Sequence, residues 1–282
     1  MNPELVAFLT SWSWEPTIVL GLGLALGLYA VGWWRLQRRS RGKNAVEVWR
    51  ALCYGCGNLL IGIALLSPIA TFAGLLLIMH MIQHVLLISA APLILLGKPL
   101  LPTLWALPLD LRRGLGRLFV PDHPLHRPFR ALTNPAVGVT IYVLTLFVWH
   151  VPRLYDVAQG YTVVHYLQHV TLIGSAMLFW WSIINPTGGR RRLNYGSAIF
   201  YLVPPMLEPH VLGMVLTFAG RPLYLTYQQV PRLWGLSVLL DQQIAGAIMW
   251  VAGEIPHLVA VSVLLVLFLR QEEQRADGLI KE

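Results

Sequence analysis

The sequence predicts an all-α integral membrane protein with seven transmembrane helices. Hydrophobic residues make up 56% of the 282-residue chain, charged residues only 12%, and the mean hydropathy is +0.61. A soluble domain carries about 25% charged residues, so this chain lacks the polar surface of a globule. It also contains seven apolar runs close to the length of about 20 residues that a helix needs to cross a bilayer. We therefore expect a single polytopic membrane domain over residues 1–282.

Each apolar run has its own composition. The first is rich in Gly and Leu, the fourth lies between two prolines, and the seventh is long enough to begin as an interfacial segment. The sixth contains Pro204, Pro205 and Pro209, so we expect its helix to break there beside a cavity, or to kink against a neighbouring helix. The expected spans are residues 17–36, 48–67, 71–97, 135–152, 161–184, 195–219 and 236–269.

Positive charge is concentrated at one end of the expected spans. Of the 21 Lys and Arg residues, 18 fall in the first, third and fifth connections and in the C-terminal tail, and only Arg153, Arg221 and Arg232 fall on the other side. The positive-inside rule therefore places the N-terminus outside, and the C-terminus and the 98–133 loop in the cytoplasm.

Within that loop, the segment 109–119 is expected to lie on the lipid bilayer as an amphipathic helix. Charge spread over separate loops on one membrane face also argues against a nucleic-acid partner.

Two expected spans carry the same histidine pattern, H-x-x-Q-H. The third span contains His80 and His84, and the fifth contains His165 and His169. Residues four apart share a helix face, with Cβ atoms about 5–6 Å apart, so each pair presents two imidazoles together. Both pairs lie at similar depth on helices that run in the same direction, and neutral imidazoles suit copper, zinc or iron. Because ionisable groups inside a bilayer are costly, we expect these four residues to form a shared metal site.

Further polar residues are expected at similar depth and are possible accessory groups. His150 ends the fourth span, Glu208 and His210 lie in the sixth, and Asp241 opens the seventh. Such groups commonly orient metal ligands or control access to them. A proton-coupled transporter that uses Glu208 and Asp241 is a further possibility.

The other reactive side chains favour structural roles. Cys53 and Cys56 form a C-x-x-C pattern in the cytoplasmic third of the second span, and one such pair cannot complete a tetrahedral metal site. Glu254 and His257 fall in the inner half of the seventh span, and we interpret them as a helix contact separate from the other polar residues. The methionines near the histidine pairs, Met81 among them, are more typical of gap filling than of copper ligation.

The chain resembles the CtaG-type cytochrome c oxidase assembly factors, a family of seven-span bacterial membrane proteins. The resemblance runs almost from end to end, and no single block carries it alone. In chain order the blocks are Trp14-Glu-Pro16, Leu28-Tyr-Ala-Val-Gly-Trp-Trp-Arg35, Ser67-Pro68, His80-Met-Ile-Gln-His84 with Ala91-Pro92 and Leu96-Gly-Lys-Pro99, Trp149-His-Val-Pro152 with Leu154-Tyr-Asp156, His165-Tyr-Leu-Gln-His169 with Phe179-Trp180, and Pro222-Leu-Tyr224 with Asp241-Gln-Gln-Ile-Ala-Gly-Ala-Ile-Met-Trp250.

This resemblance implies a role in cytochrome c oxidase maturation in a bacterial inner membrane. It implies copper as the cargo and the oxidase catalytic subunit as the partner. The positions that match the family pattern are His80, His84, His150, His165, His169 and Asp241.

Three other functions remain to be weighed, the transporter above among them. A transmembrane haem protein, either an electron carrier or a haem-handling factor, would take one axial histidine from each of two facing helices. A metalloprotease would need a glutamate between paired histidines, as in H-E-x-x-H, and neither pair has one. We therefore expect no enzyme activity, and the oligomeric state stays open.

Overall fold

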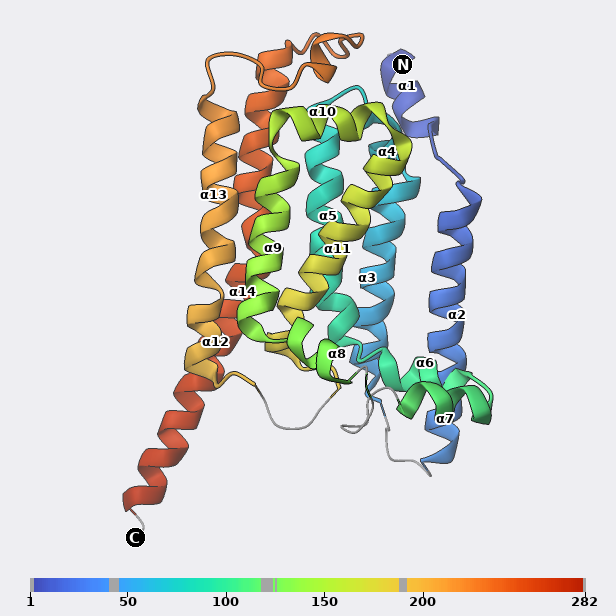
Figure 1. The fold of residues 1–282 in the computed structure, drawn as a ribbon, viewed down its shortest axis with the longest axis vertical. Coiled ribbons are helices and arrows are strands. Elements are labelled where there is room, and N and C mark those ends of the chain that lie inside the picture. Colours follow the sequence, from blue (N-terminus) through green and yellow to red (C-terminus); the bar gives the residue numbers. More distant parts are fainter. Residues whose placement is uncertain (1–2, 41–45, 118–123, 125, 188–191, 281–282) are drawn as a thin grey trace.

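Helices form all the regular structure in the computed structural model, and no strand occurs in the part that it describes. The described residues are 3–40, 46–117, 124, 126–187 and 192–280 (Figure 1). The elements are α1 (Pro3–Thr10), α2 (Pro16–Arg39), α3 (Val48–Leu66), α4 (Pro68–Phe72), α5 (Leu77–Leu96), α6 (Leu100–Ala106), α7 (Leu109–Arg117), α8 (His126–Leu132), α9 (Pro135–Trp149), α10 (Pro152–Gly160), α11 (Thr162–Ile184), α12 (Tyr195–Tyr201), α13 (Val203–Phe218), the 3-10 helix η1 (Thr226–Gln228) and α14 (Val238–Ile280).

The long helices stand side by side as a bundle (Figure 1). Six helices in the described residues are long and apolar enough to cross a membrane, with α12 and α13 together forming one of them. A seventh span results if α9 and α10, which bend by 77° at their junction, are taken as one. The chain is therefore an all-α protein with six to seven candidate membrane spans.

Several helix boundaries differ from the expected spans for reasons visible in the chain. The long helix expected to begin at residue 71 begins at Leu77, because the short helix α4 ends at Phe72 and a turn separates the two. The break expected among the prolines of the sixth span lies just before them, at Leu202. Pro204 and Pro205 lie in the first turn of α13, where a proline has no hydrogen bond to lose. Pro209 lies inside α13, and the helix continues through it without the expected break. At its far end, α14 continues to Ile280 as one helix.

Helix α5 lies at the centre of the bundle. Half of its apolar window is buried, compared with 11% for α2 at the edge, and it packs against α3, α11 and α14. Small residues allow these close contacts: a Cβ added to Gly57 on α3 would lie 3.0 Å from the Ala90 carbonyl oxygen on α5. Polar side chains on α5 therefore face other helices rather than lipid.

The two ends of the bundle differ in character. Helices α1, α4 and α10 lie at one end, here called the α10 end, and α6, α7 and α8 lie at the other, the α7 end (Figure 1). Basic residues at the α7 end contact Trp105: the guanidinium carbon of Arg112 lies 4.3 Å from the centre of its ring.

Helix α7 covers the first nine residues of the expected amphipathic segment, and the last two lie outside the described residues. Some of the charged residues used for orientation also lie outside them, namely Arg41, Lys43, Arg190, Arg191 and Lys281.

Candidate metal centre

The two histidine pairs meet at the contact between α5 and α11. The ring centroids of His80 and His165 are 5.4 Å apart, and those of His84 and His169 are 5.7 Å apart. Within each helix the paired rings are 4.1 and 4.4 Å apart. These four residues, the histidine quartet, therefore form one compact group of imidazoles, as their depth in the expected spans suggested.

The quartet has several ring nitrogens that nothing else in the described structure binds. His80 Nε2, His169 Nδ1 and both ring nitrogens of His84 are buried and have no hydrogen-bond partner among the described residues. Buried polar atoms are nearly always satisfied by protein, water or an ion. The quartet therefore has the donor atoms that a transition metal would use.

The nitrogen spacing on α11 is close to that of two ligands on one ion. His165 Nε2 lies 3.1 Å from His169 Nε2. Two nitrogens that are each about 2.0 Å from a tetrahedral ion lie about 3.3 Å apart. No group of three or more His, Cys, Asp or Glu side chains in the described part of the chain is already arranged around a common point. Metal binding by the quartet would therefore require the rings of α5 to turn toward those of α11.

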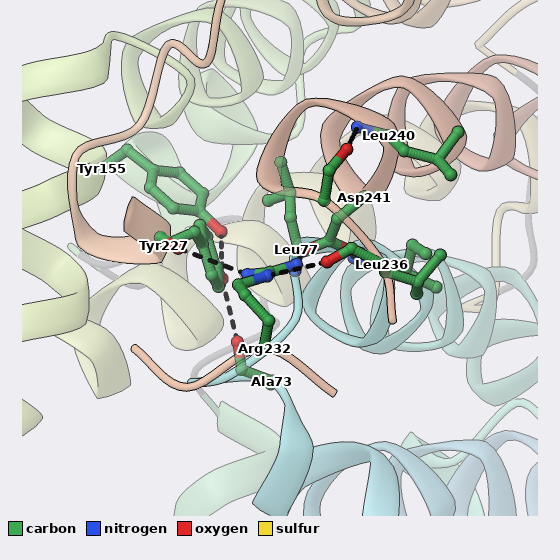
Figure 2. Close-up of polar contacts among 10 residues, drawn as sticks. Ala73, Leu77, Tyr155, Tyr227, Arg232, Leu236, Leu240 and Asp241 are labelled. Carbon is green, nitrogen blue, oxygen red and sulfur yellow. Dashed lines mark hydrogen bonds and ion pairs between the residues drawn. The ribbon is translucent and has the colours of Figure 1, made fainter. Parts of the chain in front are cut away.

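Neighbouring side chains hold His80 in place. The Gln159 Nε2 atom on α10 lies 3.1 Å from His80 Nδ1, and the Tyr155 ring packs edge-on at 5.1 Å between centroids. Tyr155 in turn hydrogen bonds to Tyr227, whose hydroxyl donates to the Ala73 carbonyl oxygen at 2.8 Å (Figure 2). Burial raises the pKa of Tyr227, so this hydroxyl stays neutral and keeps its proton for that bond.

Asp241 is an anchor for α5 rather than a member of the ring cluster. Its buried carboxylate accepts hydrogen bonds from the backbone N–H groups of Leu77 and Ile78, each at 3.0 Å. Arg232 adds a 3.0 Å ion pair to the same carboxylate (Figure 2). A carboxylate at a helix N-terminus satisfies free N–H groups and complements the helix dipole. Asp241 thereby fixes the start of α5 one turn before His80.

An open pocket of about 260 Å³ leads to the quartet from the α10 end. His165 and His169 line it together with Glu15, Thr71 and Gln159. His165 is only half-buried, and the Tyr166 hydroxyl donates to Glu15 Oε1 at 2.6 Å beside it. A small cation can therefore reach the imidazoles of α11 from that end.

A second cavity, of about 40 Å³, lies on the other side of His84. This inner chamber is lined by His84, His150, Glu208 and His257, with Tyr142 and Met249 among its apolar wall residues. His150 and Glu208 thus lie beside a quartet residue. The interpretation of His257 as separate from the other polar residues was wrong, because α14 packs closely on α13 and carries it to the same cavity.

His210 lies outside both cavities. Its Nδ1 atom is 2.6 Å from the Met206 carbonyl oxygen and 3.2 Å from Glu254 Oε1, and its ring packs on Trp250. It belongs to the contact between α13 and α14, and the same holds for Glu254. Cys53 and Cys56 on α3 are free thiols, the second of them exposed.

Residues 27–271 match the family model of the cytochrome c oxidase caa3 assembly factors, Caa3_CtaG. The chain is also similar to two mycobacterial proteins that carry no functional name. It is 27% identical over 282 residues to the uncharacterized protein Mb0105 of Mycobacterium bovis, and over 286 residues to ML1998 of Mycobacterium leprae. These alignments cover 98% and 97% of this chain but only 42% of each relative. No solved structure matches the chain.

Proposed function

The chain belongs to the CtaG family of cytochrome c oxidase caa3 assembly factors, and from this membership we propose that it binds copper at the histidine quartet and supplies it to the oxidase. The partner would be the catalytic subunit of the oxidase, in a bacterial inner membrane. Copper is the cargo in this scheme, and the chain itself makes or breaks no covalent bond.

One observation carries the proposal: four imidazoles from two helices form a single cluster with unpartnered ring nitrogens. Neutral imidazole is a good ligand for copper, and nothing in the cluster other than histidine is needed to hold it. Each helix supplies two ligands at spacing four, so the α5–α11 contact sets the geometry of the site.

The direction of supply follows from the distribution of charge. The basic connections fall at the α7 end, so the positive-inside rule puts that end in the cytoplasm and the α10 end outside. The pocket beside His165 and His169 then opens toward the outer face. Copper would enter and leave the quartet on that face.

The cavities do not favour haem as the ligand. A pocket that encloses a drug-sized molecule measures about 300–1,000 Å³. The open pocket beside the quartet measures about 260 Å³, and the inner chamber about 40 Å³. The rings of His84 and His169 also pack edge to face at 5.7 Å, with no space for a flat macrocycle between them.

Copper stoichiometry tests the proposal. The purified full chain in detergent is incubated anaerobically with cuprous ion and a reductant, and bound copper is measured after gel filtration. We expect one copper per chain in the wild type and its loss in the His80→Ala/His84→Ala variant. His126→Ala is the matched control, because it removes a histidine of α8 at the opposite end of the bundle.

Copper that is absent from the wild type, or that persists in the double variant at wild-type stoichiometry, rules out the quartet as the site. A Soret band in the visible spectrum of the purified protein would instead identify haem as the ligand.

A further inference from the structure

The wall of the open pocket that leads to the histidine quartet carries a single formal charge among the described residues. That charge is the carboxylate of Glu15. The other ionisable side chains that line the pocket are His165, His169 and Tyr166, and its remaining polar groups are uncharged hydroxyls and amides. The sign of the electrostatic field in the pocket therefore depends on one residue.

The backbone places Glu15 at the start of α2, toward the α10 end of the bundle (Figure 1). Its carbonyl oxygen accepts hydrogen bonds from the N–H groups of Ile18 and Val19, at 3.1 and 3.0 Å, as the first turn of α2 forms. The connection before it is tied to α3, because the Ser13 N–H donates to the Leu66 carbonyl oxygen at 2.9 Å. The Glu15 side chain therefore extends from a fixed point of the backbone.

One hydrogen bond holds the Glu15 carboxylate beside the histidines of α11. The Tyr166 hydroxyl donates to Glu15 Oε1 at 2.6 Å, and the two residues are 151 positions apart. A short hydrogen bond to a carboxylate is charge-assisted and fixes the oxygen that accepts it. Tyr166 lies between His165 and His169 in α11, and all three line the pocket with Glu15. The negative charge is therefore held on the route by which an ion would reach the imidazoles.

A fixed negative charge in a narrow cleft changes which ions enter it. Low-dielectric walls focus the field of the charge, so cations are concentrated in the cleft and anions are depleted. We propose that Glu15 makes the open pocket selective for cations, with Tyr166 holding its carboxylate in place. This proposal deepens the function proposed above and rests on it, because it concerns the route of copper to the quartet. Glu15 acts on the approaching ion and is not one of its ligands.

A thiol in the pocket wall measures this selectivity without any metal. His165→Cys supplies the thiol in a Cys53→Ser/Cys56→Ser background. The purified full chain in a non-ionic detergent is treated with two methanethiosulfonates of similar size, one bearing a trimethylammonium group and the other a sulfonate. Each rate is divided by the rate of the same reagent with a small free thiol, and the ratio of the cationic to the anionic value is the readout. Any effect of Glu15 on the thiol itself is common to both reagents and cancels in this ratio.

We expect the ratio to favour the cationic reagent and Glu15→Gln to lower it about tenfold, the lower end of the effect of a charged cleft on association rates. Glutamine keeps an oxygen that can accept the Tyr166 hydroxyl proton, so this variant removes the charge and retains the hydrogen bond. Glu4→Gln is the matched control. Glu4 lies in α1 at the same end of the bundle and does not line the pocket, so its replacement should leave the ratio unchanged.

Equal ratios in the Glu15→Gln and Glu4→Gln variants overturn the proposal. If Glu15→Gln does not yield folded protein, ionic strength takes its place, because the Debye length falls to about 3 Å in about 1 M salt. The preference for the cationic reagent must then decline, and a preference that persists at this salt concentration overturns the proposal as well. The ratio is measured without copper and the copper stoichiometry without the thiol, so the failure of either proposal is seen apart from the other.

Discussion

His84 of α5 and His169 of α11 face each other edge to face, with ring centroids 5.7 Å apart and ring planes at 89°. The two residues are 85 positions apart in the chain, and only the packing of α5 on α11 brings them together. Because His80 and His165 meet one turn away, this contact makes two i, i+4 pairs into a four-imidazole cluster.

Replacing the acid that anchors α5 should destabilise the whole protein. In Asp241→Asn, one amide oxygen must replace two carboxylate oxygens that accept from Leu77 and Ile78, and Arg232 loses its counter-ion. We expect a loss of about 2–4 kcal/mol in the free energy of unfolding, seen as a lower thermal midpoint in detergent. Glu272→Gln is the control, because it breaks an exposed ion pair with Arg275 and should leave the midpoint unchanged. Equal midpoints for the two variants would contradict the anchoring role.

Gln159 should tune copper affinity through His80. Its Nε2 atom lies 3.1 Å from His80 Nδ1 and donates to it. If His80 binds metal through Nε2, the ring proton moves to Nδ1, and the Gln159 amide must turn its oxygen toward the ring to accept that proton. We expect Gln159→Leu to weaken cuprous binding by about 10–100-fold in competition with a chelator. Gln159→Glu keeps an acceptor at this place and should retain the affinity. Wild-type affinity in the leucine variant would show that His80 needs no such partner.

The close approach of α13 and α14 should depend on glycine. A Cβ on Gly246 would lie 2.8 Å from the Gly213 carbonyl oxygen and 2.6 Å from Thr217 Oγ1. Gly246→Ala must push the helices apart, and we expect a loss of about 1–3 kcal/mol in unfolding free energy. Gly174→Ala, where nothing lies within 4 Å of the added Cβ, should have no effect in the same thermal assay. The packing argument fails if both variants behave alike.

Labelling from outside the cell tests the orientation of the bundle. Arg221 lies in the α13–α14 connection and Glu272 near the far end of α14, and both are exposed. In a Cys53→Ser/Cys56→Ser background, a membrane-impermeant maleimide should label Arg221→Cys in intact cells and Glu272→Cys only after permeabilisation. The opposite pattern would place the N-terminus in the cytoplasm.

The sequence predicted the helical class and the segments that become long helices, because hydropathy and helix length follow directly from local composition. From their equal spacing and similar depth it also indicated that the two histidine pairs could converge, but not that they do, because the contact between α5 and α11 is not encoded in either segment alone. The chamber was harder to foresee. Residue counting gives the depth of His257 along α14, but not the close packing on α13 that carries it to the cavity lined by His84. The role of Asp241 was hidden for a similar reason, since its backbone partners lie 163 and 164 positions away.

X-ray absorption of the copper-loaded protein tests the quartet most directly. The copper spectrum reports the identity and distance of the ligand atoms without depending on any variant. With the chain loaded at one cuprous ion, the account predicts a shell of three or four nitrogens at about 2.0 Å, with the outer-ring scattering of imidazole. A shell dominated by sulfur at about 2.3 Å would place the copper at cysteine or methionine and contradict the account.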